Sequence, residues 1–292
     1  MTKETGPFVT HFLPNPRGLF PVQTVDMRKM HRPFALAILL FLGNAAAASP
    51  VPLLPAPTKA DEKYDTKHAR NILDFWQAKS DKPAPLVVWF HGGGFTQGDK
   101  KTIADRDNFV GGFLSRGVSV ASCNYPYLKD ASYEEIMHHC ARAVQFLRSK
   151  GKEWNIDPNR IGVAGASAGA LISEWLGYHQ DLANPKDSDP VARLSSLATA
   201  VGSYWQPMGT EEMIKPLMRA GGPPIIIVTG APESDAVHHP RYARLVKSLA
   251  DGLRISAEVY GGPKNDLPPL PAGETYTSLV LTFFSKQFGL KS

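Results

Sequence analysis

The chain has 292 residues, of which 43% are hydrophobic and 20% are charged. This is the usual mix for a globular protein that can bury one large core, and a single folded domain is expected. The formal net charge is +5, but the basic residues are scattered and form no block of the kind found in nucleic-acid-binding arms, so no nucleic-acid partner is expected.

The first recognisable segment in chain order has the features of a secretory signal peptide. An apolar run over residues 34–42 follows a positively charged stretch and is too short to span a bilayer. Small residues follow, and among them Ala46 and Ala48 fit an Ala-x-Ala cleavage site before Ser49. We therefore predict a cleaved signal peptide over residues 30–48 and a periplasmic or secreted protein. The alternative is a buried core helix.

The flanking segments complete the expected division of the chain. Residues 1–29 form a polar, proline-containing stretch that a signal peptide should not carry, so we interpret them as an extension from a start codon assigned too early. Residues 49–63 are rich in proline and predict a linker, and residues 64–292 form the expected folded domain.

Within that domain, short apolar runs alternate with longer amphipathic stretches. This alternation predicts an α/β fold with a mainly parallel central sheet and helices on both faces. The expected strands are residues 85–90, 118–124, 160–165, 197–203, 224–229 and 256–260. The expected helices, which carry apolar residues on one face, are residues 132–150, 235–250 and 275–288.

Two cysteines fall in this domain. Cys123 stands at the end of an expected strand and Cys140 in the middle of the next helix. Export would allow them to oxidise, so a disulfide is one interpretation. Two separate buried thiols are the other.

The strongest motif lies between the expected strand at 160–165 and a helix. Gly165-Ala-Ser167-Ala-Gly169 matches a nucleophile elbow, a sharp turn that exposes a serine oxygen above a sheet. Small residues are needed there because the strand and helix backbones pass close together. Ser167 is therefore the candidate nucleophile. The alternative is a glycine-rich turn without chemistry.

The second motif, His91-Gly-Gly-Gly-Phe95, directly follows the expected strand at 85–90. It fits an oxyanion-hole loop, in which backbone N–H groups face the carbonyl oxygen as it becomes negative. The candidate donors are Gly92, Gly93, Gly94 and Ala168, each worth about 3 kcal/mol. We interpret His91 as a structural brace of the loop rather than as a base.

Together the two motifs resemble the hormone-sensitive-lipase and feruloyl-esterase-like (BD-FAE-like) branch of the α/β-hydrolase esterases. The resemblance covers residues 64–288 and includes Asn124-Tyr125, although Pro126 stands where the family has an arginine. It implies an α/β-hydrolase fold and a serine ester hydrolase that acts on a small-molecule or carbohydrate ester. No metal-ligand spacing or phosphate-binding loop is present in the sequence, so no cofactor is expected.

The resemblance places the acid after the strand that ends near Gly230. Glu233 has the spacing typical of the family and is slightly favoured, whereas Asp235 fits if the loop is longer. The carboxylate that is not used would lie at a helix N-terminus, facing the helix dipole.

The base is missing from its usual place. The family's histidine follows the strand that ends near Tyr260, yet the chain has no histidine after His239. Asn265 and Asp266 stand at about that place, and neither can exchange a proton near neutral pH as an imidazole can.

Two histidines after the acid loop offer a replacement. His238 or His239 could reach the nucleophile because the loops that follow parallel strands gather at one edge of the sheet. Otherwise they begin a helix whose first turn is fixed by Pro240. The absent family histidine leaves two hypotheses: an ester hydrolase with a relocated base, or a hydrolase-fold binding protein that has lost its activity.

Aromatic residues supply candidate walls for a substrate pocket. They are Tyr127, Tyr204 and Trp205. Trp205 could equally belong to the core.

Overall fold

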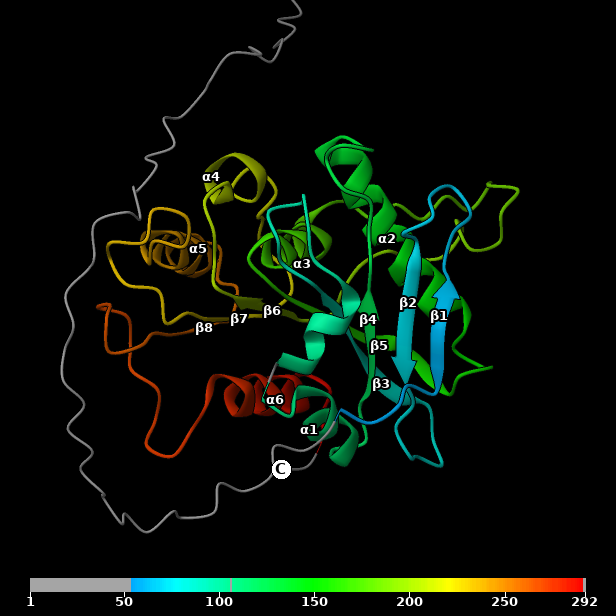
Figure 1. The fold of residues 1–292 in the computed structure, drawn as a ribbon, viewed down its shortest axis with the longest axis horizontal. Coiled ribbons are helices and arrows are strands. Elements are labelled where there is room, and N and C mark those ends of the chain that lie inside the picture. Colours follow the sequence, from blue (N-terminus) through cyan, green and yellow to red (C-terminus); the bar gives the residue numbers. More distant parts are fainter. Residues whose placement is uncertain (1–53, 106, 291–292) are drawn as a thin grey trace, which may run out of the picture. The chain divides into compact units, whose positions relative to one another are not determined.

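An eight-stranded sheet organises the residues that the computed structural model describes, 54–105 and 107–290 (Figure 1). Its strand order is β1-β2-β4-β3-β5-β6-β7-β8. The strands are β1 (Lys59–Lys63), β2 (Ile72–Trp76), β3 (Ala84–Phe90), β4 (Ser119–Cys123), β5 (Ile156–Ala166), β6 (Val201–Tyr204), β7 (Ile225–Val228) and β8 (Ala257–Tyr260). Strands β3 to β8 pair in parallel, whereas β2 is antiparallel to both β1 and β4. The predicted mainly parallel sheet is confirmed.

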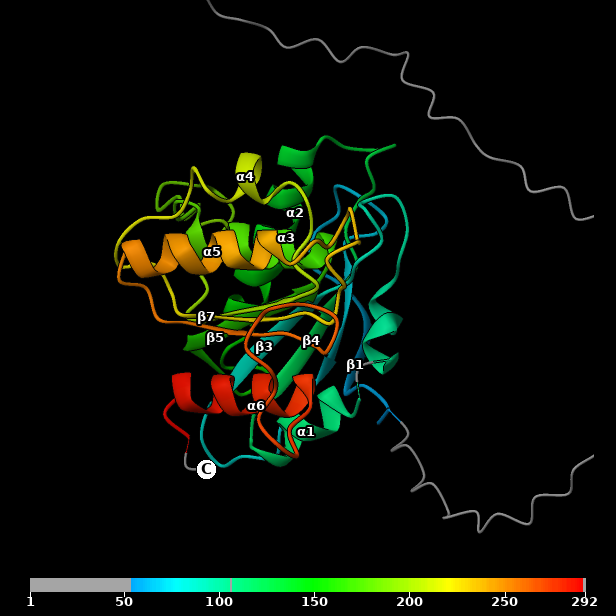
Figure 2. The same ribbon diagram turned by 90° about the vertical axis from the view of Figure 1, so that its left-hand side faces the viewer.

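Helices cover both faces of the sheet, as Figures 1 and 2 show. On one face lie α2 (Tyr133–Ser149), α3 (Ala168–Tyr178), the short α4 (Thr210–Met213) and α5 (Arg241–Gly252). On the other lie α1 (Phe109–Ser115) and α6 (Tyr276–Gln287), with a 3-10 turn, η1 (Lys100–Asp105), ahead of α1. Each face buries its own cluster of apolar side chains. The sheet is therefore covered on both sides, which explains why its central strands are continuous apolar runs.

The six predicted strands are all present, with ends shifted by a few residues. The largest differences are at the starts of β5, which begins four residues early at Ile156 and includes polar residues, and of β6, which begins four residues late at Val201. Strands β1 and β2 were not predicted. The residues of β1 are polar and mostly exposed, so the sequence shows no apolar pattern that would indicate a strand. This strand forms by pairing with β2 at the edge of the sheet. Part of the expected linker, residues 49–63, is therefore a strand.

Two of the expected helices match closely and one begins late. Ser132 caps the N-terminus of α2 in a capping box with Glu135, so this helix begins where the sequence predicts. Helix α5 was expected from residue 235 but begins at Arg241. The carboxylate of Asp235 accepts the N–H groups of Val237 and His238, and these bonds hold a loop instead of a helical turn.

The two cysteines are separate buried thiols in this structure, the second of the two interpretations. Burial raises the pKa of both Cys123 and Cys140. None of the helices formed by residues 54–105 and 107–290 is long and apolar enough to cross a membrane. The expected extension at residues 1–29 and the expected signal peptide at residues 30–48 lie outside the described residues.

Candidate active site

The serine of the predicted elbow stands at the carboxyl edge of the sheet, between β5 and α3. Ser167 is the N-cap of α3 and has φ 55° and ψ −118°, a strained backbone conformation for a residue with a side chain. A Cβ on Gly169 would overlap the carbonyl group of Phe90 in β3. Glycine is therefore required at that position of the motif, because the helix starts directly against the neighbouring strand.

A histidine from the loop after β7 reaches the serine. The Nε2 atom of His238 lies 2.9 Å from the Oγ atom of Ser167. The other ring nitrogen, Nδ1, lies 3.4 Å from a carboxylate oxygen of Asp235. A neutral imidazole with its proton on Nδ1 faces that carboxylate and leaves Nε2 free to accept the serine proton. The three side chains thus form a serine, histidine and carboxylate relay.

The carboxylate of this relay is also fixed by the backbone of its own loop. One oxygen of Asp235 accepts the N–H of His238 at 2.8 Å and that of Val237 at 2.9 Å. The hydrogen bond from the His238 N–H holds the pKa of the Asp235 carboxyl below its usual range. Asp235 is therefore ionised at neutral pH, and its second oxygen is turned to the imidazole.

The slightly favoured acid, Glu233, takes no part in this relay. Its carboxylate pairs with Arg244 on α5, at 3.1 Å, and with His239, at 3.5 Å. The hydrogen bond from Arg244 lowers the pKa of Glu233. The preference for Glu233 is therefore not supported by the geometry. The structure brings Asp235 and His238 to Ser167, and it holds Glu233 and His239 in a separate ion-pair cluster.

The place of the family's histidine, after β8, is occupied by residues with structural contacts. The side-chain amide of Asn265 donates to the backbone carbonyls of Thr229 and Ala231, at 3.2 and 2.8 Å. Asp266 pairs with Arg244. Asn265 thus ties the loop after β8 to the loop after β7, which carries the relay histidine.

The glycine loop after β3 lies beside the nucleophile. Gly93 has φ 113° and Gly94 has φ 59°, and a Cβ on Gly93 would overlap the backbone of Gln97. Gly94 and Ala168 line the pocket that contains Ser167. Ala168 is the first residue of α3, so its N–H belongs to the turn that has no acceptor within the helix.

His91, at the start of this loop, is buried and braced on several sides. Its ring stacks on Tyr125 with centroids 4.2 Å apart, and the Tyr125 hydroxyl donates to the His91 carbonyl. Burial lowers the pKa of His91 to about 4, so its imidazole is neutral. These contacts agree with a structural brace.

Sequence reasoning missed Arg70 as a part of this brace. Its guanidinium lies 3.3 Å from Nε2 of His91, donates to the carbonyls of Tyr125 and Gly98, and stacks over the ring of Tyr127. Arg70 comes from the turn before β2, yet it supplies a guanidinium beside the Asn-Tyr turn where the family's arginine is replaced by Pro126. The sequence offered one hint of this role, the replacement of the family's arginine by Pro126.

The three aromatic residues expected in the pocket have different places. Tyr127 supports the glycine loop through its contact with Arg70. Tyr204 is buried, and its ring packs against Trp89 on the face of the sheet that carries α1 and α6. Neither lines the pocket around Ser167. Trp205 lies edge-on to the His238 ring, with centroids 6.0 Å apart, and so contacts the relay.

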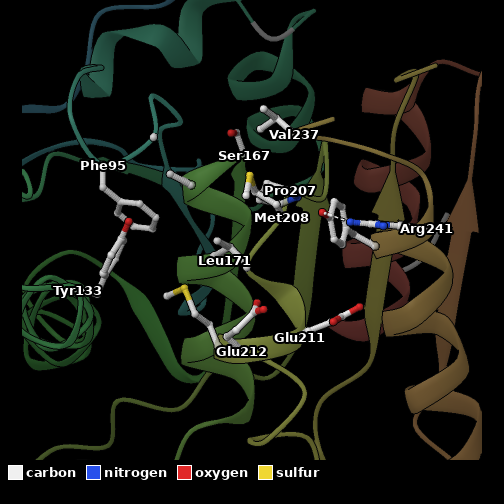
Figure 3. A pocket seen from close by; sticks show the side chains of 15 residues that line it. Phe95, Tyr133, Ser167, Leu171, Pro207, Met208, Glu211, Glu212, Val237 and Arg241 are labelled. Atoms are coloured by element: carbon white, nitrogen blue, oxygen red, sulfur yellow. Dashed lines mark hydrogen bonds between the residues drawn. The ribbon is translucent and has the colours of Figure 1, made fainter. Parts of the chain in front are cut away.

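The pocket beside Ser167 has a volume of about 550 Å³ (Figure 3). Most of its wall is apolar, with contributions from Phe95, Leu171 and Met213. Charged residues of α4 and α5, Glu211, Glu212 and Arg241, line the rest. In the view of Figure 3, the serine and Glu212 lie at opposite ends.

Three apolar residues that line this pocket are exposed to solvent. Tyr133, Met208 and Val237 line it and are 48%, 55% and 45% exposed. They are three of the five exposed large apolar side chains within the part of the chain that the structure describes. No group of three or more histidine, cysteine or acidic side chains in that part could hold a metal ion.

Comparison with known proteins agrees with this geometry. The BD-FAE family model matches residues 73–212, which include the glycine loop and the nucleophile elbow. The esterase LipI of Mycobacterium tuberculosis is 31% identical over 105 residues, which are 35% of this chain and 32% of that protein. The chain thus matches about a third of the length of this curated relative. The relay residues Asp235 and His238 lie beyond the segment that the family model matches.

Solved structures extend the likeness to most of the chain. An acetyl ester-xyloside bifunctional hydrolase from Caldicellulosiruptor lactoaceticus has a TM-score of 0.64 at 21% identity and covers 75% of this chain and 89% of its own. An esterase of Thermogutta terrifontis with bound propionate has a TM-score of 0.64 at 20% identity and covers 82% of this chain and 97% of its own. The chain is an α/β-hydrolase-fold protein with the BD-FAE resemblance over residues 73–212.

Proposed function

We propose that this protein is a serine hydrolase of carboxylic esters. The observation that carries the proposal is the relay itself, with Nε2 of His238 2.9 Å from Oγ of Ser167 and Nδ1 turned to Asp235. This is the arrangement that activates a serine for attack on an acyl carbon. The likeness to esterases in sequence and in fold supports the same reaction class.

In the proposed mechanism each group has a role in two half-reactions. Oγ of Ser167 attacks the acyl carbon while His238 takes its proton on Nε2, and the N–H groups of the glycine loop and of Ala168 face the oxyanion. The ester bond then breaks, and His238 gives the proton to the leaving alcohol. Water repeats the sequence on the acyl-enzyme: it loses a proton to His238, the acid product leaves, and the proton returns to Ser167. Asp235 holds the imidazole in its orientation and stabilises the cation that forms.

The other hypothesis, a hydrolase-fold binding protein without activity, rested on the missing histidine. The contact of His238 Nε2 with Ser167 Oγ supports a base that comes from a different loop, while the side chain of Asn265 donates to backbone carbonyls at the usual place. The absence of the family's histidine is therefore no longer a reason to expect an inactive protein, and the comparisons do not support that hypothesis.

Within this class, an acylated carbohydrate is the substrate that we propose. The acetyl ester-xyloside hydrolase and a carbohydrate esterase from gut microbiota share the fold. The pocket offers carboxylates and a guanidinium, on Glu211, Glu212 and Arg241, which can hydrogen-bond hydroxyl groups at a distance from the serine. Its apolar part suits an acyl or aromatic group.

Hydrolysis assays with matched variants test the proposal. Purified protein should hydrolyse p-nitrophenyl acetate, and Ser167→Ala and His238→Ala should each lower kcat by about 10²- to 10⁴-fold. His239→Ala is the matched control, since its ring pairs with Glu233, and it should stay within about twofold of the unchanged protein. Turnover that survives Ser167→Ala, or folded protein without turnover and without fluorophosphonate labelling of Ser167, would refute the esterase.

A second assay addresses the alcohol part of the substrate. Acetylated xylose should be hydrolysed with a higher kcat/KM than p-nitrophenyl acetate, and Glu212→Gln should reduce only the first value. Equal values for both esters, or equal losses in the variant, would exclude a carbohydrate-binding role for this part of the pocket.

We also propose that the protein is exported, on the strength of the signal-peptide pattern over residues 30–48. Expression of the full chain, followed by fractionation and N-terminal sequencing, tests this. Mature protein beginning at Ser49 outside the cytoplasm is expected. Protein that keeps residues 30–48 and stays in the cytoplasm would contradict export.

A further inference from the structure

A carboxyl group without a counter-charge is buried behind the pocket. Glu174 lies two turns along α3 from the nucleophile, and its relative exposure is 0%. One carboxylate oxygen, Oε2, accepts a hydrogen bond from the side-chain amide of Gln206 at 2.9 Å. The other, Oε1, has no hydrogen-bond partner among the described residues. A fully buried carboxylate with so little compensation is costly, and the neutral acid is favoured instead.

The pKa of Glu174 agrees with this description. Burial raises it to about 8, while the hydrogen bond from Gln206 opposes the rise. The titratable groups on neighbouring elements are few. Tyr178 lies on α3 itself, the exposed Glu211 and Glu212 are on α4, and on α2 the ring of His138 lies against Trp175, the residue next to Glu174. Among the described residues, no positively charged side chain forms an ion pair with Glu174.

The amide that contacts Glu174 is the centre of a buried polar network. Gln206 also donates to the hydroxyl of Thr210, at 2.8 Å, and accepts from the hydroxyl of Ser203 at the end of β6. Thr210 in turn donates to the carbonyl of Pro207, at 2.8 Å. All four side chains of Ser203, Glu174, Gln206 and Thr210 are buried. The network therefore joins the nucleophile helix to the segment between β6 and α4, which spans residues 205–209.

That segment contacts both the relay and the substrate pocket. Trp205 adopts φ 56° and lies edge-on to the His238 ring. Pro207, Met208 and Gly209 line the pocket. The N–H of Met208 donates to the carbonyl of Val237, at 2.6 Å, directly before the relay histidine. A displacement of the segment would therefore move the wall of the pocket and release one side of His238.

We propose that Glu174 is a positioning residue for ester hydrolysis: as a neutral acid it holds Gln206, and through it the segment 205–209, against His238. Ionisation of Glu174 would strengthen its bond to Gln206 but leave a buried charge whose second oxygen, Oε1, has no donor among the described residues. Hydration of that charge requires the buried network to open, and this displaces the segment. This inference rests on the proposed function, since the position that it controls is that of the proposed base. Glu174 touches none of the reacting atoms, so its effect reaches the reaction through Gln206 and Trp205.

The pH profile of the unchanged protein and of Glu174→Gln tests this role. Glutamine keeps the shape and the acceptor oxygen but cannot ionise. Above the pKa of about 8, kcat/KM of the unchanged protein for p-nitrophenyl acetate should fall about tenfold per pH unit, after subtraction of the Ser167→Ala background. Glu174→Gln should match it at pH 7 within about twofold and lack this fall. The same fall in both proteins would overturn the proposal.

Two further variants separate positioning from general damage to the fold. Glu174→Ala removes the acceptor for Gln206 and should lower kcat about tenfold at pH 7, with recovery in Glu174→Gln. Ser285→Ala is the matched control, because this buried hydroxyl on α6 donates to the Leu281 carbonyl of its own helix, away from the pocket, and it should leave kcat and KM unchanged. Unaltered kcat in Glu174→Ala would also refute the proposal.

Thermal melts give a readout that does not depend on catalysis. The folded-state pKa is raised above the unfolded value, so the stabilisation by protonated Glu174 is complete below the unfolded pKa and is lost as the pH rises to about 8. The Tm of the unchanged protein should fall relative to Glu174→Gln over that interval and stay level above it. If the Tm shows this pH dependence but the protein has no Ser167-dependent turnover, the esterase proposal has failed, and the positioning role fails with it. A Tm difference that is independent of pH would show that Glu174 is not a buried neutral acid.

Discussion

At the scale of single residues, one short loop supplies both the carboxylate and the imidazole that lie in line with Ser167. Asp235 and His238 stand three positions apart, and the carboxylate binds the backbone N–H of the very residue whose ring it faces. The same carboxylate therefore fixes the loop and orients the imidazole. Glu233, two positions earlier, is held by Arg244 instead. The choice of acid depends on which carboxylate the loop turns inward.

A pair of amide substitutions tests this choice. Asp235→Asn removes the charge that favours the imidazolium, and it should lower kcat by about 10²- to 10⁴-fold. Glu233→Gln breaks an exposed ion pair and should change kcat by about twofold or less. Steady-state kinetics on p-nitrophenyl acetate, with circular dichroism to verify folding, would measure both. A larger loss in Glu233→Gln than in Asp235→Asn would return the acid role to Glu233.

At the scale of elements, the glycine loop after β3 is held by a residue from another part of the sheet. Arg70 precedes β2 and reaches His91, two backbone carbonyls and the ring of Tyr127. These contacts fix the start of the loop that carries Gly92, Gly93 and Gly94. The antiparallel edge formed by β1 and β2 thus has a role in the site, because it delivers this guanidinium.

Loss of the Arg70 brace should affect turnover more than binding. In Arg70→Ala the glycine loop loses its support, and because oxyanion donors act in the transition state, kcat should fall about tenfold with a smaller change in KM. Arg70→Lys should recover little, since an ammonium cannot reproduce the planar, forked contacts.

Arg193→Ala provides the matched control for this experiment. Arg193 also donates to backbone carbonyls, of Asp187 and Ser188, but in an exposed loop. This variant should keep both kcat and KM. A loss of turnover in Arg193→Ala equal to that in Arg70→Ala would show that the effect is not specific to the glycine loop.

At the scale of the whole molecule, the two faces of the sheet have different roles: one carries the pocket and the other is covered by packed helices. Helices α2 to α5 cover one face of the sheet, and α1 and α6 cover the other (Figure 2). The pocket is lined by residues of α2 to α5, and Glu174 lies on α3 of the same face. Phe284 of α6 is completely buried and packs on the sheet where Gly162 of β5 and Gly202 of β6 leave room for its ring. This contact holds α6 to the two strands that support the elbow and the Trp205 segment.

Phe284→Ala should therefore cost stability without a direct effect on chemistry. Removal of a buried ring leaves a cavity and should lower the free energy of unfolding by about 3–5 kcal/mol. Urea denaturation would measure the loss, and the protein that remains folded should keep its KM. Thr282→Ala, at an exposed position of the same helix, should stay within about 0.5 kcal/mol of the unchanged protein. A loss below about 1 kcal/mol in Phe284→Ala would mean that α6 is not held by this ring.

The sequence by itself determined the sheet, most of its strands and the sharp turn that carries Ser167. Buried strands are runs of apolar residues, and the elbow at Ser167 needs small residues at fixed spacing. Both features depend on residues that are close in sequence, so a local pattern predicts them. The same holds for the glycine loop at His91. Strand β1 was not predicted because an exposed edge strand has no apolar pattern.

Only the tertiary structure decided which acid and which histidine face Ser167. Glu233, Asp235, His238 and His239 lie within seven positions of one loop, and their chemistry alone does not say which point inward. The contribution of Arg70 and the burial of Glu174 could not be predicted from the sequence either, because both follow from contacts between segments far apart in the chain. Local patterns fix the backbone, whereas the direction of a side chain in a loop is set by the partners that the fold brings to it.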